Sequence, residues 1–191
     1  NRENKLDYPY QTSWGVSTRM MGALIMVHSD DYGLVLPPRI APNKVVIIPI
    51  SNDLEIMSMA NDYLDKLKKE GIEAYIDDSE KSPGYKFAEA EVLGIPVRIE
   101  IGKRDLENNV ITLVRRDTRE KREVFTNTDI VHDVKILLED IQRDMYDRAL
   151  RRREEMTYTC TDIEDFKDII NNHPGFVKAM WCGDTACEEK I

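Results

Sequence analysis

The sequence has 191 residues, of which 41% are hydrophobic and 33% are charged, which suits one or two water-soluble domains with a substantial core. Its formal net charge of −9 argues against tight, non-specific binding to nucleic acid, because such binding depends on an excess of cations. No apolar run approaches the roughly 20 residues of a membrane span and no signal peptide is visible, so we expect a cytoplasmic protein without a membrane partner.

The cysteine count and the start of the chain add two expectations. Three cysteines, an odd number, favour the reduced thiols of the cytosol over disulfides. The sequence lacks a starting methionine and begins in what reads as a hairpin, so we expect a fragment of a longer protein. Cations concentrate at 81–104, 115–122 and 148–153, which fits either a basic surface or separate solvated faces.

The first segment with a distinct pattern covers residues 11–42. Small hydroxyl residues and Gly15 precede Arg19, and the apolar residues 22–27 that follow read as a buried element. An arginine in this position can hold a phosphate or a carboxylate through its planar guanidinium. It can equally be a solvated residue of a surface turn, and the pattern alone leaves both interpretations open.

Residues 44–127 alternate between strand and helix patterns. The apolar run 44–50, rich in β-branched residues, predicts a buried and parallel central strand. The order of elements is strand, helix, strand, helix and three more strands, which predicts an α/β fold around a mixed sheet. The predicted elements after the first strand lie at 52–71, 73–77, 82–94, 95–101, 110–114 and 122–125.

For two of these elements the sequence also predicts which side chains are buried. The helix at 52–71, capped by Asn52 or Asp53, is expected to bury one apolar face at helical spacing. Strand 95–101 alternates apolar residues with Arg98 and Glu100, so we expect it to be half-buried. The apolar residues predicted for the helix face are Leu54, Met57, Ala60, Leu64 and Leu67.

A long helix and a short tail complete the chain. Residues 129–155 form a continuous helical pattern with an apolar stripe, which is expected to leave the α/β domain and bridge to the tail. A second helical stretch covers 163–172, and Cys160 reads as a packing residue. Cys182 and Cys187, spaced C-x4-C, are either half of a tetrahedral zinc site or two unligated thiols.

The string TSWGVSTRMMGALIMVHSDDYGLVLPPRIAP resembles the third signature motif of class II aminoacyl-tRNA synthetases, in the form found in prolyl-tRNA synthetases of the archaeal and eukaryotic type. The resemblance continues through essentially the whole chain. It implies that Arg19 binds ATP and that Thr18 and Ser17 lie at the adenylate. It also implies that Trp14 and Gly15 belong to the wall of the amino-acid pocket.

The segment SPGYKFAEAEVLGIPVRIEIGKRDL resembles the anticodon-binding domain shared by prolyl, threonyl, glycyl and histidyl synthetases, and the prolyl version most closely. Anticodon bases are unpaired, so their edges are open to side-chain hydrogen bonds. A carboxylate can accept from guanine N1–H and N2–H₂, and a cation can donate to O6 and N7. The anticodon-binding residues implied in this way are Glu89, Lys86, Arg98, Tyr85 and Lys103, with Phe87 as an alternative stacking surface.

The resemblance also implies a domain division and a function. Residues 1–42 would be the motif 3 remnant of a class II catalytic domain, 43–127 an anticodon-binding domain, and 128–191 a linker helix with a truncated, small α+β C-terminal domain of zinc type. The parent enzyme would be a homodimer that activates L-proline with ATP and Mg²⁺ and charges tRNA(Pro). This fragment would mainly supply anticodon recognition and be inactive alone, because motifs 1 and 2 are missing.

Zinc and three rival interpretations complete the expectations. The intact family domain carries four zinc cysteines; Cys182 and Cys187 match only the first pair, so we expect no complete Zn²⁺ site in this fragment. A non-catalytic RNA-binding module is disfavoured by Arg19, and a threonyl or glycyl synthetase by the LPPR string and the C-x4-C spacing. A doubly wound nucleotide-binding domain is disfavoured because residues 51–53 are not glycine-rich.

Overall fold

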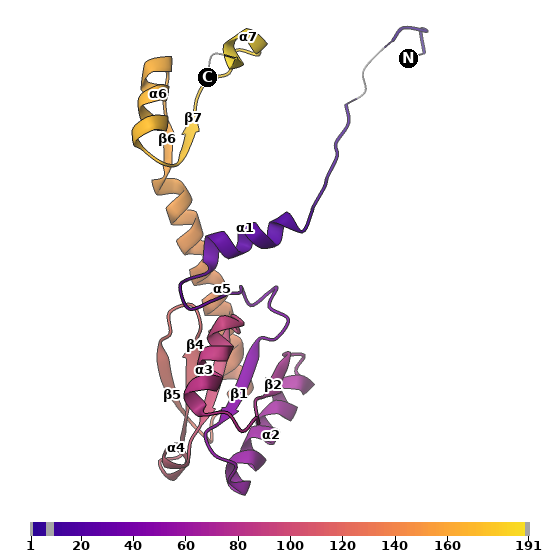
Figure 1. The fold of residues 1–191 in the computed structure, drawn as a ribbon. Helices are drawn as coiled ribbons and strands as arrows, with labels where there is room; N and C mark the ends of the chain where they lie inside the picture. The colour runs from indigo at the N-terminus through magenta and orange to yellow at the C-terminus, as the bar shows by residue number, and fades with distance from the viewer. Residues whose placement is uncertain (1, 7–9, 190–191) are drawn as a thin grey trace.

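The structure, a computed structural model, describes residues 2–6 and 10–189, and it leaves the side chains of Cys187 and Glu188 undescribed. Three parts follow one another along the chain (Figure 1). An extended N-terminal segment leads into helix α1 (Arg19–His28), an α/β body follows, and the long helix α5 (Ile130–Glu155) connects that body to a small tail.

A five-stranded mixed sheet forms the centre of the body, with the strand order β2-β1-β3-β4-β5. The pairs β1–β2 and β1–β3 are parallel, whereas β3–β4 and β4–β5 are antiparallel. The prediction of an α/β fold around a mixed sheet is therefore confirmed. The strands are β1 (Val45–Pro49), β2 (Ala74–Ile76), β3 (Val97–Ile101), β4 (Val110–Arg115) and β5 (Lys121–Phe125).

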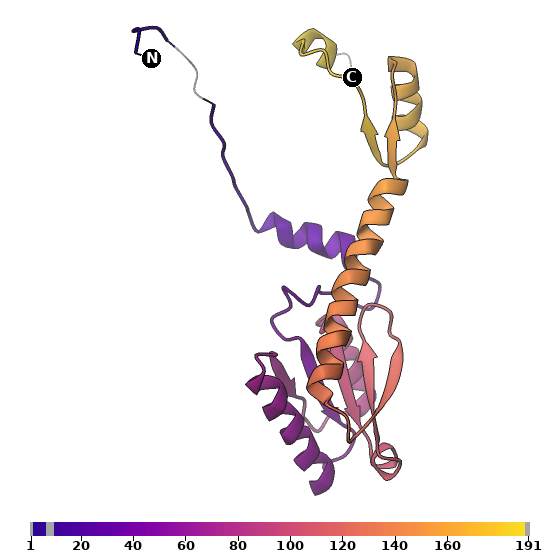
Figure 2. The same cartoon turned by 180° about the vertical axis from the view of Figure 1, so that it is seen from behind.

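Helices cover the two faces of this sheet unequally. Helices α2 (Leu54–Lys69) and α5 pack on one face, which is the nearer one in Figure 2. Helix α3 (Pro83–Val92) packs on the other face, where the buried apolar cluster contains only Val46, Ile48, Ala90 and Ile95. Every residue of β1 is buried because both of its faces are covered, which explains its unbroken apolar sequence.

The buried face of α2 agrees with the predicted one only in part, since Ala60 and Leu67 are buried as predicted and Leu64 is partly buried against the core. Leu54 is 90% exposed, and the buried residues of the helix are Ile56, Ala60, Tyr63 and Leu67. At about 100° per residue these four lie within one narrow stripe, whereas Leu54 lies nearly opposite to Ile56. The prediction placed Leu54, the first apolar residue of the helix, on the buried face. The face that packs against the sheet instead starts at Ile56.

Strand β3 is more buried than the predicted half-buried strand. All five of its residues are buried, including Arg98 and Glu100. These two side chains point to the same face as α3, where they contact one another and neighbouring side chains instead of water. A short helix, α4 (Lys103–Glu107), follows β3 and was not predicted, because five residues are too few for a periodic pattern.

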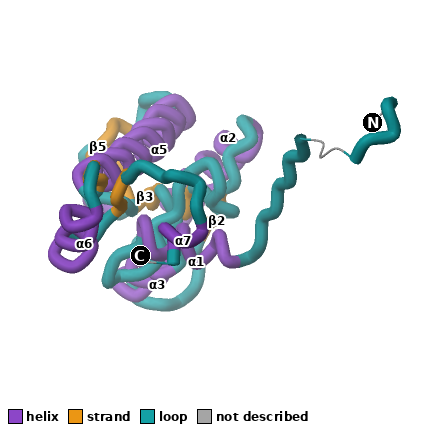
Figure 3. The backbone as a smooth tube through the Cα atoms, turned by 90° about the horizontal axis from the view of Figure 1, so that it is seen from above, coloured by secondary structure: helices purple, strands orange, loops and turns teal. Residues whose placement is uncertain are grey.

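Helix α1 does not form the buried element predicted at residues 22–27. None of its residues is buried, and Met20 and Met26 are 61% and 79% exposed. The helix packs mainly against α5, and the segment before it extends away from the body (Figures 1 and 3). The described part of the chain therefore provides no layer that could cover the apolar side chains of α1.

Helix α5 and the tail follow the predicted pattern closely. The Asp129 carboxylate accepts hydrogen bonds from the backbone N–H groups of Val131 and His132, at 3.1 and 3.3 Å, and so caps α5. The tail contains a parallel strand pair, and Cys160 is buried beside it. Among the described helices, none has an apolar stretch long enough to cross a membrane. The tail elements are β6 (Thr157–Thr159), α6 (Ile163–Asn172), β7 (Phe176–Lys178) and α7 (Thr185–Glu188).

An ion pair joins the turn after α1 to the end of α3. Arg116 donates from Nη1 and Nη2 to the two carboxylate oxygens of Asp30, at 2.8 and 2.6 Å. Its Nε donates to the carbonyl oxygen of Glu91, at 2.9 Å. The Arg116 side chain is only 2% exposed, so one buried guanidinium fixes two segments that lie far apart in the sequence.

This pair predicts a pH-dependent contribution to stability. The hydrogen bond from Arg116 lowers the pKa of Asp30 from 3.8 to about 2. The contribution is therefore complete above pH 4 and is lost as pH falls toward 2. We expect Asp30→Asn to lower the free energy of unfolding by about 1 kcal/mol at pH 7, a value discounted because the Asp30 side chain is 35% exposed.

Urea unfolding of both proteins between pH 7 and pH 2.5 measures this contribution. The difference between wild type and Asp30→Asn should shrink as pH falls. A difference that stays constant over this range would show that the carboxylate charge of Asp30 contributes nothing to stability.

Candidate nucleic-acid interface

The side of the sheet that carries α3 includes charged side chains from β3 and β5. By strand register, Arg98 on β3 lies beside Val114 on β4, which lies beside Lys121 on β5. Glu100 lies beside Thr112 in the same way. Helix α3 lies over β1, and Lys121 at the edge of the sheet is exposed (Figure 1). This side of the sheet is therefore accessible at its β5 edge, whereas Arg98, Glu100 and Val114 nearer to α3 are buried.

Arg98 is the centre of this surface. Its Nε donates to Glu100 Oε1 at 2.9 Å, and its Nη1 donates to Glu91 Oε1 at 3.3 Å and to the carbonyl of Phe87 at 3.4 Å. The guanidinium carbon lies 4.5 Å from the centre of the Phe87 ring. Two carboxylates and one aromatic ring thus hold a guanidinium whose side chain is 8% exposed.

Lys121 extends this cluster toward solvent. Its Nζ lies 3.2 Å from Glu100 Oε2 and 5.8 Å from the centre of the Phe87 ring. Glu100 therefore binds two cations, one through each carboxylate oxygen. Since the side chain of Lys121 is 58% exposed, it can reach an anionic ligand while it stays near the ring.

A second cluster lies on the other side of α3. Glu89 accepts a hydrogen bond from Lys81 Nζ at 2.9 Å, and this contact raises the pKa of Lys81. The same ammonium group lies 4.5 Å from the centre of the Tyr85 ring. Glu89 and Tyr85 are four residues apart, so they share one face of α3. Phe87 and Glu91 share the face toward Arg98 by the same spacing.

The structure thus distributes the predicted anticodon residues over several places. It brings Glu89 and Tyr85 together through Lys81, and it places Arg98 across α3 from them. Lys86 is buried between the two clusters and donates from Nζ to the carbonyl of Asp77 at 2.9 Å. Lys103 is exposed at the start of α4. The roles assigned to these residues from the sequence stay predictions.

Three residues of the Arg98 cluster received no role from the sequence. Glu91 follows Phe87 by four residues on a helix, and Glu100 follows Arg98 by two residues on a strand, so each pair shares a face. This periodicity was a usable signal for both acidic residues. Lys121 carried no such signal, because its proximity to Glu100 depends on the pairing of β4 with its two neighbours.

The residues predicted to bind ATP and the amino acid lie at and before the start of α1. Arg19 is the first residue of the helix, and Ser17 Oγ accepts a hydrogen bond from its backbone N–H at 3.4 Å. Trp14 is 93% exposed, and no atom of a distant residue approaches the Cβ position of Gly15 within 4 Å. Thr18 is also exposed. The described chain does not gather these residues into a cavity, and their roles stay predictions.

The predicted half of a zinc site lies in the tail. Cys182 is exposed just before α7, and the side chain of Cys187 falls outside the described residues. No group of three or more His, Cys, Asp or Glu side chains with metal-binding geometry occurs in the described part of the chain. Since tetrahedral zinc requires four ligands, these residues by themselves do not fit a closed zinc site.

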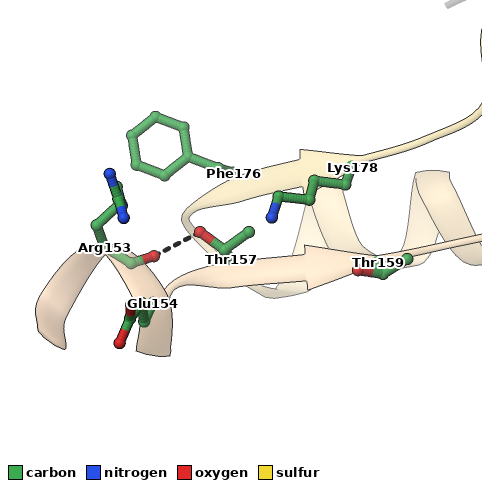
Figure 4. A pocket seen from close by; sticks show the side chains of 6 residues that line it. All are labelled: Arg153, Glu154, Thr157, Thr159, Phe176 and Lys178. Atoms are coloured by element: carbon green, nitrogen blue, oxygen red, sulfur yellow. Dashed lines mark hydrogen bonds between the residues drawn. The ribbon is translucent and has the colours of Figure 1, made fainter. Parts of the chain in front are cut away.

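Apart from the clusters beside α3, a concave surface lies where α5 meets the tail (Figure 4). Its volume is about 590 Å³. The guanidinium of Arg153 lies near the Phe176 ring, and Lys178 extends along β7 on the same side. Glu154 also lines this groove, so its charge is mixed. The residues that line it are Arg153, Glu154, Thr157, Thr159, Phe176 and Lys178.

Comparison with known proteins shows which family the chain resembles. Residues 44–131 match the family model described as "Anticodon binding domain". Proline–tRNA ligases from Clostridium botulinum (strain Loch Maree / Type A3) and Lachnoclostridium phytofermentans are 50% and 52% identical to the chain over 192 aligned residues, which cover 100% of it. Over its whole length, the chain is therefore similar to prolyl-tRNA synthetases. It spans 40% of the length of each of these two relatives.

A solved structure of a prolyl-tRNA synthetase supports the same assignment. The enzyme from Cryptosporidium parvum, complexed with L-proline and AMP, matches 91% of this chain and 38% of its own, with a TM-score of 0.84 and 36% identity. The family resemblance found in the sequence is therefore confirmed. Since the matched range 44–131 contains all five strands of the main sheet, both clusters beside α3 lie in the part of the chain that matches the anticodon-binding domain model. The groove of Figure 4 lies outside that region.

Proposed function

We propose that this chain is the anticodon-recognising part of a proline–tRNA ligase, and that the surface formed by Phe87, Glu91, Arg98, Glu100 and Lys121 binds the anticodon of tRNA(Pro). One observation carries the proposal. Within the region that matches anticodon-binding domains, an aromatic ring, two cations and two carboxylates converge from α3, β3 and β5.

The chemistry of guanine suits this cluster. Arg98 contacts one of the two carboxylate oxygens of Glu91, so the carboxylate keeps acceptor capacity for guanine N1–H and N2–H₂. The guanidinium of Arg98 has donors for O6 and N7, and the half-buried Phe87 ring provides a surface for a base or ribose. Lys121 lies at the exposed rim, where a phosphate of the loop would pass.

The parent protein would carry out the chemistry that this chain lacks. We assign to it the ATP- and Mg²⁺-dependent joining of L-proline to tRNA(Pro), as a homodimer in the cytoplasm. There Arg19 would hold ATP, Ser17 and Thr18 would lie at the adenylate, and Trp14 and Gly15 would line the amino-acid pocket. The exposed apolar side chains of α1 support this assignment, because they require a covering layer that a longer protein would supply.

This chain alone is expected to be inactive, and Cys182 and Cys187 are expected to complete a zinc site only together with further ligands. Adenylate formation needs several charged groups around ATP and Mg²⁺ at once, because it depends on orientation and electrostatics. Arg19 is the single cation that the motif places there. Two cysteines likewise provide half of the ligands that zinc requires.

A matched pair of lysine and arginine variants on β5 tests the proposed surface. Lys121 and Arg122 are neighbours, so their side chains point to opposite faces of the sheet, and both are exposed. We expect Lys121→Ala to weaken binding of the tRNA(Pro) anticodon stem-loop by about fivefold, and to lower the salt dependence of binding by about one phosphate contact. Arg122→Ala should change affinity less than twofold.

Fluorescence anisotropy with labelled stem-loop RNA, between 50 and 200 mM salt, measures both quantities. Circular dichroism confirms that each variant keeps its fold. Equal losses for the two variants would indicate diffuse charge attraction in place of a site on the α3 side. If the wild-type chain does not distinguish the tRNA(Pro) stem-loop from one with substituted anticodon bases, the proposed function is wrong.

A further inference from the structure

The segment that follows α1 packs tightly against the end of α3. The backbone N–H of Leu34 donates to the carbonyl of Val92 at 3.1 Å, and that of Leu36 donates to the carbonyl of Gly94 at 3.4 Å. Gly33 has φ +137°, and a Cβ placed on it would lie 2.4 Å from Val92 Cα. This contact leaves no space for a side chain, so the two segments can only move together or separate.

Two side-chain contacts strengthen this junction. Arg116, at the end of β4, binds the Asp30 carboxylate with both Nη atoms and the Glu91 carbonyl with Nε. Three residues further on, the guanidinium of Arg119 lies 3.7 Å from the centre of the Tyr32 ring. The turn at 30–33 is therefore held by the same hairpin that holds the C-terminal end of α3.

The junction connects two sites of the proposed function. Glu91 is the residue whose carboxylate contacts Arg98 and whose carbonyl is bound by Arg116. On the other side, Asp30 lies two residues after the end of α1, which begins at Arg19. A displacement of α3 therefore reaches α1 through the turn at 30–33, without passing through the core beneath α2 and α5.

Helix α3 makes a smaller apolar contact with the sheet than α2 and α5 do. The apolar cluster at this contact has four buried residues, one of which, Ala90, belongs to α3 itself, and the partly buried Tyr75 and Phe87 pack against it. The opposite face of the sheet is covered by two longer helices and a much larger cluster. A helix with few buried contacts has a lower free energy of local displacement than the elements of the main core.

From these contacts we infer that Asp30 and Arg116 are positioning residues, which transmit occupation of the anticodon surface at α3 to the placement of Arg19. This inference rests on the proposed function. It assigns to the buried ion pair a coupling role between two sites, in addition to its contribution to stability. A coupling of this kind typically changes the response of one site to the other by about 5- to 150-fold.

Kinetics of the full-length protein that contains this chain provide the first test. We expect Asp30→Asn to leave ATP–pyrophosphate exchange without tRNA within twofold of wild type, and KM for tRNA(Pro) within threefold. The kcat for aminoacylation should fall by about fivefold or more, and the kcat difference between tRNA(Pro) and an anticodon-substituted tRNA should shrink. Asp30→Glu, which keeps the carboxylate, should recover most of the loss.

An exposed ion pair elsewhere supplies the matched control. Glu70 accepts from Lys135 Nζ at 2.7 Å, and so joins the end of α2 to α5 on the opposite face of the sheet. Glu70→Gln should change none of the kinetic quantities. If Asp30→Asn lowers pyrophosphate exchange as much as aminoacylation, or lowers neither, the coupling role is overturned.

Amide hydrogen exchange tests the coupling in the wild-type chain, without any substitution that could alter its fold. Addition of the tRNA(Pro) anticodon stem-loop should slow exchange at the N–H groups of Leu34 and Leu36 by severalfold, whereas exchange in α2 should not change. If the RNA binds without any change at these two amides, the coupling role is again overturned. If the RNA does not bind with anticodon preference, it is the proposed function that fails.

Discussion

Replacement of Arg98 by methionine is expected to lower the free energy of unfolding of this chain by about 3 kcal/mol, and to reduce anticodon stem-loop binding below detection. The side chain of Arg98 is 8% exposed, and it is the partner of both Glu91 and Glu100. Without the guanidinium, the Glu100 carboxylate stays buried with Lys121 as its one remaining cation. Removal of one partner from a buried ion pair typically costs about 3–5 kcal/mol, because the other charge is left without compensation.

Urea unfolding followed by circular dichroism measures the loss of stability, and the anisotropy titration measures the loss of binding. Arg143→Met is the matched control, since Arg143 is 62% exposed and pairs with Asp140 on the surface of α5. Exposed pairs of this kind contribute little, so this variant should unfold and bind RNA almost as wild type does. A similar loss of stability in both variants would show that the buried ion pairs of Arg98 contribute no more to the free energy of unfolding than an exposed pair does.

Replacement of Glu91 by glutamine is expected to lower the preference for guanine in the anticodon by about tenfold. A carboxylate offers guanine N1–H and N2–H₂ two charged acceptor oxygens, whereas an amide offers one neutral oxygen, and a specific base contact is typically worth about 1–3 kcal/mol. Glu91 contacts Arg98, which lies over the Phe87 ring. The substitution would therefore also affect the donors that Arg98 presents to guanine O6 and N7. Binding of stem-loops with each guanine replaced in turn measures this preference.

The same assay on Glu89 compares two assignments. The sequence predicts Glu89 as the acidic reader, so Glu89→Ala should weaken the selection of guanine and leave ATP binding in the full enzyme intact. The structure places Glu89 with Lys81 and Tyr85 on the other side of α3, which favours Glu91. A loss of guanine preference at Glu89 and not at Glu91 would move the binding surface to the Lys81 side of the helix.

Much of the fold followed from local patterns in the sequence. Strand β1 was predictable because an unbroken apolar run with β-branched residues indicates burial on both faces. Helix α6 was predicted at its observed bounds, and α5 within one residue of its observed start. These elements carry strong periodicity, but the sequence pointed to Asn127 or Thr128 as the start of α5, whereas the side chain that caps the helix is that of Asp129. The errors at α1 and α2 concern which face is covered, which depends on neighbours.

The order of the five sheet strands with α2, α3 and α5, the mixed character of the sheet and the family resemblance were predictable from the sequence alone, because periodicity and motif strings are local properties. Tertiary structure alone decided which side of α3 faces Arg98, and therefore which charged residues of the helix contact it. On a helix, Glu89 and Glu91 are two positions apart and point about 200° away from one another, so the packing of the helix decides which of them meets Arg98. Contacts such as Arg116 with Asp30, 86 positions apart, likewise exist only because the chain folds back on itself.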